Sequence, residues 1–224
     1  TPLTIVQGYL ELLGEMQDLD SGTRREFLNK ARWACEELVL LQANIMDASR
    51  ISFDTATLYC KSIPLKEVCT SMVELFDPLI LQEQRQFEVN VGPSVRVWAD
   101  EIRLKQILRN LLANALRYSP AHTPLVISAV EEQEEGMVRL KVTDRGWGVP
   151  PEKHEAIFER FVRLERDLHG TNRGSGLGLA ITRQLVEAMQ GTITVESSGI
   201  SGEGSTFTFT IPVAPPGASE GSEC

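Results

Sequence analysis

The sequence lacks a long apolar run, a visible signal peptide and an excess of basic charge, and each absence excludes a class of protein. A helix needs about 18 or more consecutive apolar residues to span a membrane, and no such run is present. No segment at the start reads as a secretory signal. The 22 Lys and Arg against 31 Asp and Glu give a net charge of −9, which argues against a general nucleic-acid binder. A local basic patch for a nucleotide is still compatible with that total.

The cysteines show neither a redox motif nor a metal-binding motif. Cys35, Cys60, Cys69 and Cys224 contain no C-x-x-C pair and no metal-ligand spacing. This pattern predicts buried or inert thiols in a reducing, cytoplasmic compartment. The P-loop motif G-x-x-x-x-G-K-[ST] and the Rossmann spacing G-x-G-x-x-G are also missing, which excludes these two phosphate-binding folds.

The chain has 224 residues, of which 42% are hydrophobic, enough for one or two domains with a packed core. It begins with Thr1 rather than Met, and the opening residues TPLT already read as helix. We interpret the sequence as a fragment of a longer protein.

Residues 1–51 read as two amphipathic helices. Ser21 or Thr23 is expected to cap the second helix. The apolar residues recur at alternating steps of three and four, as in the seam of a helical bundle. We expect an antiparallel hairpin that pairs with a second copy into a four-helix bundle; the alternative is a hairpin that docks on the rest of its own chain. The seam residues are Leu3, Val6, Leu10 and Leu13, then Phe27, Ala31, Ala34, Leu38, Leu41 and Ile45.

Residues 52–213 mix strands and helices without a strict β-α-β rhythm. This predicts an α+β fold, a two-layer sandwich with one mixed sheet and helices on one of its faces. The residues from Ala214 to Cys224 are small, polar and rich in proline, so this tail is expected to be disordered. Strands are expected at 55–63, 87–91, 95–98, 125–130, 137–143, 192–197 and 206–211, and helices at 64–82, 102–118 and 177–189.

The helix expected at 102–118 is amphipathic in an unusual way. One side carries a stripe of Leu and Ile, and another carries Asn110, Asn114 and Arg117, which lie on one face because they are spaced by four and three. An amide oxygen suits a hard divalent cation, and a guanidinium suits phosphate oxygens. This helix is therefore a candidate half of a nucleotide site. The alternative is that both asparagines are solvated surface residues.

Two glycine-rich segments supply the rest of the candidate site. In DRGWGVP, from Asp144 to Pro150, the glycines let the backbone approach a ligand, and the carboxylate can accept a hydrogen bond from an exocyclic amine such as that of adenine. In GSGLGL, from Gly174 to Leu179, alternating glycines precede a helix and expose backbone N–H groups to phosphate. The alternative for the first segment is a plain turn.

The segment between the two glycine-rich motifs is long and basic. It carries Arg160, Arg163, Arg166, His169 and Arg173. A connection of this kind is expected of a lid that closes over a polyphosphate. The alternative is an ordinary exposed loop.

In combination and in this order, the motifs resemble those of the catalytic, ATP-binding domain of sensor histidine kinases, in the ATPase superfamily shared with gyrase, MutL and the heat-shock chaperone. NLLANALRYS resembles the N box, DRGWGVP the G1 box, IFERFVR the F box and GSGLGLAI the G2 box. The helical pair before them is similar to the dimerisation and phosphoacceptor domain. In that domain the phosphorylated histidine begins the motif H-E-x-x-T-P-L, and this chain opens at TPL.

The resemblance implies roles for individual residues. Asn114 would ligate Mg²⁺, with Asn110 beside it on the metal or its water, and Asp144 would read the adenine amine. Thr1 matches a threonine that assists phosphatase activity in some relatives. Phe158 and Phe161 would anchor the lid on the core. The implied ATP-binding residues are Asn110, Asn114, Arg117, Tyr118, Asp144, Gly146, Gly148, Arg173, Gly174, Gly176, Leu177 and Gly178.

The resemblance also implies an activity and partners. The parent would be a homodimeric, ATP- and Mg²⁺-dependent histidine kinase that passes its phosphoryl group to the receiver domain of a response regulator. None of His122, His154 and His169 is nominated as the acceptor, so this chain is not expected to phosphorylate itself. No nucleic acid and no membrane contact is expected for this chain, although its parent can be membrane-anchored. One alternative is an inactive ATP-binding dimerisation module. The other, an ATP hydrolase of the gyrase type, would want an acid where Asn110 stands.

Overall fold

The chain divides into two compact units, residues 1–56 with 167–175 and residues 57–166 with 176–224. The boundary after residue 56 lies close to the change of composition at Ser52. The computed structural model describes residues 2–16, 19–25, 27, 28, 30, 31, 34, 35, 38, 58–132, 135–164, 175–215, 222 and 223.

The first unit contains helix α1 (Pro2–Glu15) and a second helical stretch that begins at residue 21. Asp20 caps this second stretch, because its Oδ1 accepts hydrogen bonds from the N–H groups of Gly22 at 2.9 Å and Thr23 at 3.0 Å. The expected caps, Ser21 and Thr23, are therefore wrong: they lie one and three positions after Asp20. The rings of Tyr9 and Phe27 lie 5.4 Å apart, so the two helical stretches are in contact.

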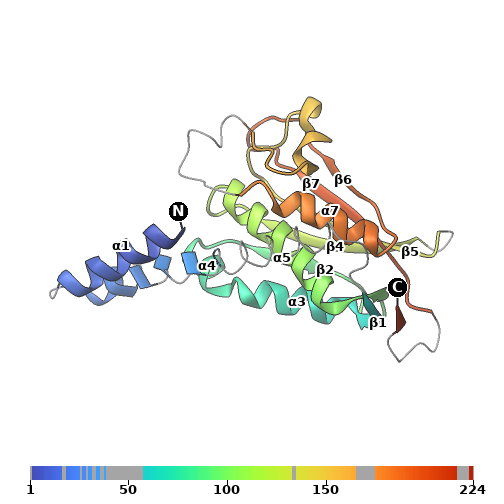
Figure 1. The fold of residues 1–224 in the computed structure, drawn as a ribbon, viewed down its shortest axis with the longest axis horizontal. Helices are drawn as coiled ribbons and strands as arrows, with labels where there is room; N and C mark the ends of the chain where they lie inside the picture. The colour runs from blue at the N-terminus through green and yellow to red at the C-terminus, as the bar shows by residue number, and fades with distance from the viewer. Residues whose placement is uncertain are drawn as a thin grey trace. The chain divides into compact units, whose positions relative to one another are not determined.

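The second unit is built on a five-stranded mixed sheet (Figure 1). Its strand order is β2-β4-β5-β7-β6, where β2 and β4 are parallel and all other neighbours are antiparallel. This arrangement confirms the expected α+β fold with a mixed sheet. The strands are β2 (Phe87–Asn90), β4 (Leu125–Glu132), β5 (Met137–Thr143), β6 (Ile193–Glu196) and β7 (Thr206–Pro212).

Three helices, α3 (Leu65–Leu75), α5 (Glu101–Tyr118) and α7 (Gly178–Ala188), lie side by side over one face of this sheet (Figure 1). The central helix α5 buries its apolar stripe completely against the sheet and its two neighbours. Each buried Leu or Ile contributes about 1.5–3 kcal/mol, so α5 is a rigid support for residues on its other sides. The fully buried stripe consists of Leu104, Ile107, Leu108, Leu111 and Leu112.

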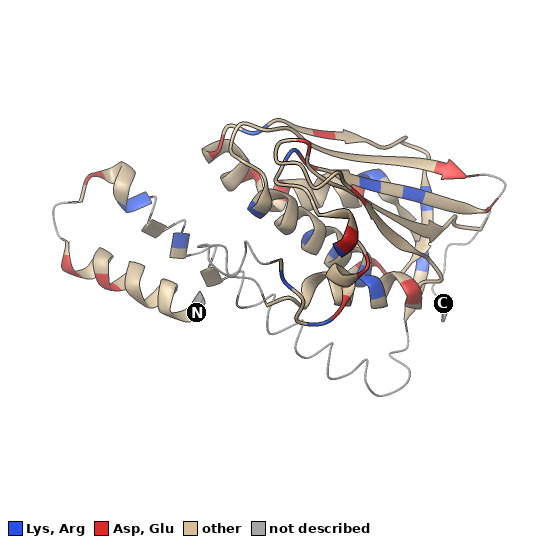
Figure 2. Ribbon diagram, turned by 90° about the horizontal axis from the view of Figure 1, so that it is seen from above, with Lys and Arg blue, Asp and Glu red and all other residues tan. Residues whose placement is uncertain are grey.

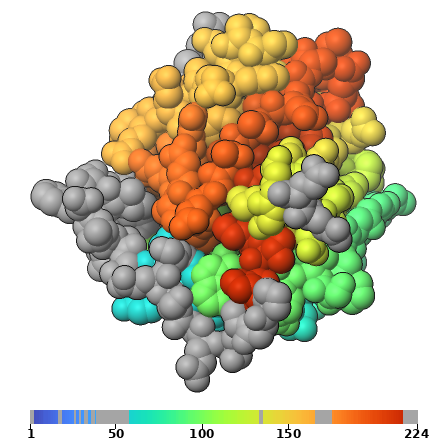
Figure 3. Space-filling view, turned by 90° about the vertical axis from the view of Figure 1, so that its right-hand side faces the viewer, coloured from blue at the N-terminus to red at the C-terminus, as the bar shows by residue number. Residues whose placement is uncertain are grey.

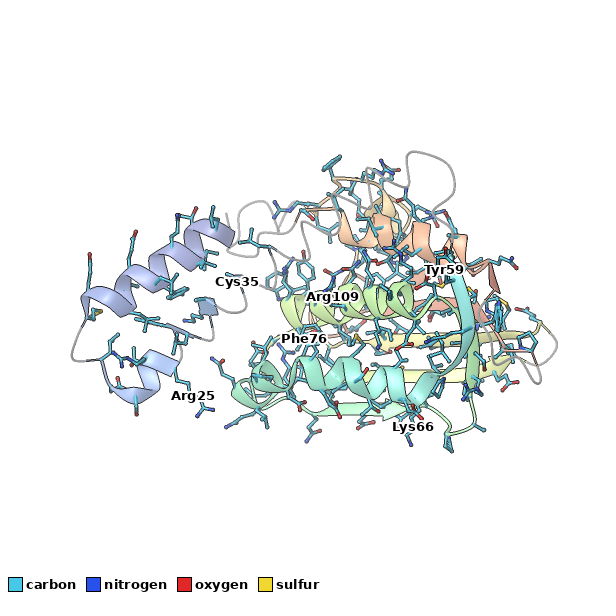
Figure 4. All side chains as sticks on the ribbon, turned by 60° about the horizontal axis from the view of Figure 1, so that its bottom comes forward. Arg25, Cys35, Tyr59, Lys66, Phe76 and Arg109 are labelled. Carbon is cyan, nitrogen blue, oxygen red and sulfur yellow. The ribbon has the colours of Figure 1, made fainter. Side chains whose placement is uncertain are left out.

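The helix expected at 64–82 is in fact two helices, α3 and α4 (Asp77–Gln82), which meet at Phe76 (Figure 4). Pro78 stands in the first turn of α4. A proline has no N–H to donate into a preceding turn and favours the start of a helix over its interior, which accounts for the break.

A second, smaller sheet of order β3-β1-β8 lies outside the expected single sheet. It is formed by β1 (Tyr59–Pro64), β3 (Arg96–Ala99) and β8 (Ser222–Glu223). The expectation of a disordered tail is therefore wrong at Ser222 and Glu223, because the edge of β1 offers them backbone partners opposite Tyr59 and Cys60. Figure 3 views the molecule from this side, with the C-terminal part of the chain in deep red.

The cysteines differ from one another more than the sequence suggested. Cys60 is buried and disulfide-bonded, so the expectation of four free thiols is wrong at this position. Cys69 is a free, buried thiol whose pKa is raised to about 12, because burial disfavours the thiolate. Cys35 is free and exposed.

Charged residues of both signs are interspersed along the helices and strands (Figure 2). On neighbouring strands β4 and β5, for example, Arg139 donates to both carboxylate oxygens of Glu132, at 2.6 and 2.9 Å. Within the described part of the chain, none of the helices combines the length and the hydropathy that a membrane crossing requires.

Candidate nucleotide-binding site

Helix α5 is fixed at its start by Asp100, whose Oδ1 accepts from the N–H groups of Ile102 at 3.0 Å and Arg103 at 3.1 Å. This cap satisfies two of the four N–H groups that a helix start leaves unpaired. With its N-terminus capped and its stripe buried, α5 holds its remaining side chains in a defined register. Asn110 is one of these.

Asn110 is only 3% exposed and lies between α5 and α7. Its Nδ2 donates to the carbonyl oxygen of Gly178 at 3.2 Å and lies 3.3 Å from Oγ1 of Thr182. Its Oδ1 is buried and has no hydrogen-bond partner among the described residues. The alternative of a solvated surface asparagine is therefore wrong for Asn110. A buried acceptor without a donor costs about 1–3 kcal/mol, and such groups are typical of sites that bind a ligand or ion.

Asn114 and Arg117, one and two turns further along α5, are half-buried. The described residues contain no cluster of three His, Cys, Asp or Glu side chains that could hold a metal ion. A metal at this site can be bound by amide oxygens together with phosphate oxygens of the nucleotide and water. Mg²⁺ accepts such a ligand set, because it usually keeps waters and phosphate oxygens in its coordination shell. The unpartnered Oδ1 of Asn110 fits this requirement.

Asp144 follows strand β5 and is 5% exposed. Its Oδ1 accepts from the backbone N–H of Gly146 at 2.6 Å and from Oγ of Ser119 at 3.3 Å. Burial raises the pKa of the Asp144 carboxyl above its ordinary value of 3.8, and the hydrogen bond from Gly146 opposes that shift. The second carboxylate oxygen can accept from a donor of a ligand, as the adenine amine requires.

The DRGWG segment packs directly on the end of α5. A Cβ built on Gly146 would lie 2.3 Å from the carbonyl oxygen of Tyr118, which no side chain could tolerate. The same oxygen accepts from the N–H of Trp147 at 3.2 Å, and the rings of Tyr118 and Trp147 lie 6.4 Å apart. Gly146 is thus required for close packing between the two segments, and Tyr118 lies against the loop that carries Asp144.

A second loop supports the DRGWG segment from its other side. Gly202 donates its N–H to the carbonyl oxygen of Gly146 at 2.8 Å. A Cβ on Gly204 would lie 2.0 Å from the carbonyl oxygen of Asp144. Gly148 adopts a φ of +71°, which favours glycine, and faces Ser197. Gly202 and Gly204 are not among the residues expected from the sequence, although their place in a cluster of small residues between two strands is a signal of close packing.

Helix α7 begins at Gly178 with Leu177 at its N-cap. Leucine cannot accept a hydrogen bond with its side chain, so this residue provides no capping oxygen of the kind that Asp100 provides to α5. The first N–H groups of α7 and its positive dipole end are suited to an anion such as phosphate. The start of α7 thus supplies the second half of the candidate site.

The segment between the glycine-rich motifs begins in direct contact with the second motif. Phe161 donates its N–H to the carbonyl oxygen of Gly176 at 2.9 Å, and a Cβ on Gly176, whose φ is +70°, would contact the backbone of Phe161 at 2.9 Å. Phe158 is buried and meets Phe207 edge to face. Phe161 is 72% exposed, so its expected anchoring on the core is wrong: its backbone, not its ring, makes the contact.

Helix α5 connects the candidate residues. Asn110 contacts the start of α7, and Tyr118, eight residues later and so about 12 Å along the helix, contacts the DRGWG segment. The contacts of this one helix thereby link five of the candidate residues: Asn110, Tyr118, Asp144, Gly146 and Gly178. Five residues with expected roles lie outside the described part of the chain, and their roles remain predictions. They are Thr1, Arg166, His169, Arg173 and Gly174.

Arg85 is a supporting residue that was not expected from the sequence. It is 7% exposed, and its guanidinium donates to the carbonyl oxygens of Ser119 at 2.7 Å and Leu116 at 3.2 Å. It also contacts Glu83 and donates to Thr123 at 3.2 Å. These bonds hold the end of α5, where Ser119 meets Asp144. No motif marks Arg85 in the sequence, because the two carbonyl oxygens that it holds at the end of α5 lie more than thirty positions away.

Comparisons with known proteins identify the family of this chain. The model of the family "Histidine kinase-, DNA gyrase B-, and HSP90-like ATPase" matches residues 99–215. The adaptive-response sensory kinase SasA of Synechococcus sp. (strain JA-3-3Ab) is 33% identical over 218 residues, 95% of this chain and 56% of SasA. The sensor histidine kinase WalK of Bacillus subtilis (strain 168) is 29% identical over 213 residues, 95% of this chain and 34% of WalK. The chain spans about half the length of SasA and about a third of WalK.

Solved structures show the same fold. Full-length ShkA in complex with AMPPNP is 27% identical with a TM-score of 0.69, over 96% of this chain and 46% of ShkA. Histidine kinase ThkA in complex with the response regulator protein TrrA is 25% identical with a TM-score of 0.65, over 97% of this chain and 59% of that chain. This chain belongs to the histidine kinase-, DNA gyrase B- and HSP90-like ATPase family, and its ATPase domain is of the sensor histidine kinase type.

Proposed function

We propose that this chain binds ATP together with Mg²⁺ at the site around α5. The observation that carries the proposal is the position of α5, which contacts the start of α7 through Asn110 and the Asp144 loop through Tyr118. Phosphate and base are at opposite ends of ATP. The middle of α5, at Asn110, adjoins a helix start that suits an anion, and its C-terminal end, at Tyr118, adjoins a loop with a carboxylate acceptor. A neighbour of the same fold is a complex with the ATP analogue AMPPNP, which supports the proposal by analogy.

Each residue has a specific task in the proposed complex. Asp144 accepts the hydrogen bond of the adenine amine, and the Tyr118 ring lies against the base. The N–H groups at the start of α7, around Leu177 and Gly178, face the phosphates, with Arg117 nearby. Asn114 and Asn110 hold Mg²⁺ through their amide oxygens. The bound metal would supply positive charge against the phosphate oxygens.

A nucleotide titration tests the site. Asn114→Ala should abolish the Mg²⁺-dependent part of ATP binding and change the free energy of unfolding by no more than about 1 kcal/mol, because the residue is half-exposed. The matched control is Asn90→Ala, an asparagine on β2 outside the site, which should bind as the wild type does. An unchanged ATP affinity of Asn114→Ala would remove that residue from the site.

We further propose that the chain is the kinase core of a cytoplasmic two-component signalling protein. In this role the γ-phosphoryl group of ATP passes to the histidine of a phosphoacceptor motif, with release of ADP, and from there to an aspartate of a response regulator receiver domain. Placing the sequence HELR before Thr1 and adding γ-labelled ATP tests the first step: acid-labile label on the added histidine supports it. The chain without HELR should remain unlabelled. Nucleotide binding with no label on the extended chain would favour the alternative, an ATP-binding dimerisation module without transfer activity.

The proposed quaternary structure is a homodimer through the N-terminal helices. Leu3 and Leu10, two residues of the expected seam on α1, are 54% and 55% exposed within one chain. Pairing with a second copy would bury them. Leu10→Glu should therefore convert a dimer to a monomer in sedimentation, whereas Leu81→Glu, at an exposed leucine of α4, should not. A dimer that survives Leu10→Glu would show that other residues form the contact.

A further inference from the structure

Thr182, in the second turn of α7, contacts the side chain of Asn110 in the interior. Its relative exposure is 0%, and its Oγ1 lies 2.8 Å from the carbonyl oxygen of Gly178 and 3.3 Å from Nδ2 of Asn110. Gly178 O is also the other partner of Asn110 Nδ2, at 3.2 Å. Three polar groups of α5 and α7 thus form one closed set of hydrogen bonds.

The donors in this set can be assigned one by one. A carbonyl oxygen can only accept, so Gly178 O accepts from both side chains. Thr182 has a single hydroxyl proton, which it gives to Gly178 O, as threonines within helices often do toward the residue four positions earlier. Toward Asn110, Thr182 can therefore only accept. Both neighbours of the amide on this side are acceptors, and they require Nδ2 rather than Oδ1 to face α7.

The opposite orientation of the amide would be unfavourable. It would place Oδ1 of Asn110 about where Nδ2 now stands, close to the carbonyl oxygen of Gly178, so that two acceptors face each other without a proton between them. It would also leave both Nδ2 protons in the buried position where Oδ1 now has no partner among the described residues. An unpaired buried donor is costly. Thr182 and Gly178 thus keep Oδ1 turned away from α7.

We infer that Thr182 is a positioning residue for the proposed nucleotide site: its hydroxyl fixes the amide of Asn110 so that Oδ1 is presented to the Mg²⁺–nucleotide complex. The inference rests on the proposed function. Thr182 itself touches neither metal nor nucleotide; it acts through Asn110. Such outer residues commonly orient metal ligands, and losing one lowers metal affinity by about 10- to 100-fold.

Three variants separate positioning from packing. Thr182→Val keeps the shape of the side chain and removes the hydroxyl, and Thr182→Ser keeps the hydroxyl. Thr208→Val is the matched control, because Thr208 on β7 is also buried but its Oγ1 has no partner among the described residues. ATP affinity is titrated for each with Mg²⁺ and with EDTA. The side-chain amide protons of Asn110 are followed by NMR in the nucleotide-free protein.

The inference predicts a selective loss in Thr182→Val. The gain in ATP affinity that Mg²⁺ provides should fall by about tenfold or more, while the affinity in EDTA stays as in the wild type. Hydrogen exchange of the Asn110 amide should become faster. Thr182→Ser should restore both properties, and Thr208→Val should change neither. In an Asn110→Ala background, Thr182→Val should have no further effect on the Mg²⁺-dependent gain.

Two results would overturn the inference. A full Mg²⁺-dependent gain in Thr182→Val would show that Asn110 needs no help from Thr182. An equal loss with and without Mg²⁺ would assign Thr182 to packing alone. Failure of the proposed function gives a different result from failure of this inference. If the proposed function is wrong, the wild-type chain itself binds no ATP in the same titration.

Discussion

The carbonyl oxygen of Tyr118 lies 2.3 Å from the position that a Cβ on Gly146 would occupy. The last residue of α5 and the loop after β5 are thus in contact at a distance that only glycine permits. Any side chain at Gly146 must displace either the end of the helix or the loop that carries Asp144. Both are parts of the proposed nucleotide site.

Gly146→Ala should therefore impair nucleotide binding as well as stability. We expect ATP affinity to fall at least about tenfold and the free energy of unfolding to fall by about 1–3 kcal/mol, as for other overpacked sites. The control is Gly8→Ala in α1, where a Cβ meets nothing within 4 Å. That variant should keep its ATP affinity and gain up to about 1 kcal/mol from helix propensity. Wild-type affinity of Gly146→Ala, measured by titration, would contradict the packing described above.

Asp144→Asn should separate stability from nucleotide binding. Because burial raises the pKa of Asp144, the folded protein binds a proton more tightly than the unfolded chain does. The free energy of unfolding therefore falls as pH rises from the pKa of this carboxyl in the unfolded chain to its higher pKa in the folded protein. Above that range the whole destabilisation by the buried carboxylate is present. Asparagine carries no charge and keeps an acceptor for Gly146.

The expected result is an Asp144→Asn protein at least as stable as the wild type at neutral pH, with weakened ATP binding. The stability difference between the two proteins should shrink as pH is lowered toward the ordinary aspartate range. Thermal unfolding across pH 4–8 and an ATP titration measure the two effects. A variant much less stable at neutral pH would show that the charged carboxylate of Asp144 holds its loop together.

Arg85→Ala should loosen the end of α5. It removes the donors to the carbonyl oxygens of Leu116 and Ser119 and leaves buried acceptors unpaired. We expect a loss of about 2–4 kcal/mol, together with weaker ATP binding because Ser119 donates to Asp144. Arg85→Lys should recover only part of the stability, since an ammonium group cannot reproduce the planar set of guanidinium donors.

The control for Arg85 is Arg96→Ala. Arg96 also makes two hydrogen bonds, to Oγ and O of Ser62, but it is exposed. Its loss should cost under about 1 kcal/mol and leave ATP affinity unchanged. Equal costs for the two arginines, measured by urea unfolding, would contradict the role assigned to Arg85.

Glu101→Gln should reduce stability in a pH-dependent way. Hydrogen bonds from Lys105 and Lys61, both at 2.6 Å, lower the pKa of Glu101 to about 2. The stabilisation is therefore complete above the ordinary glutamate pKa of 4.5 and is lost as pH falls through about 2. After solvent screening we expect about 1 kcal/mol or less at neutral pH, and less still at high salt.

Glu74→Gln provides the comparison for Glu101, because Glu74 is exposed on α3. The difference in stability between the two variants should disappear in acid and in concentrated salt. Unfolding curves at pH 7 and pH 2 with and without salt measure it. A difference that persists in both conditions would point to a cause other than the lysine pairs.

The sequence by itself determined the local features of this protein. The apolar stripe of α5, the hairpin of β4 and β5, and the start of α7 near Gly178 follow from periodicity and glycine placement, which act over a few residues. Tertiary structure decided everything that depends on partners distant in the chain. It buried Asn110 between two helices, gave its amide an orientation through Thr182, and placed Arg85 on the end of α5. It also added β8 to the edge of β1. These contacts join residues tens of positions apart, and a burial or a hydrogen bond of that kind exists only once the chain has closed around it.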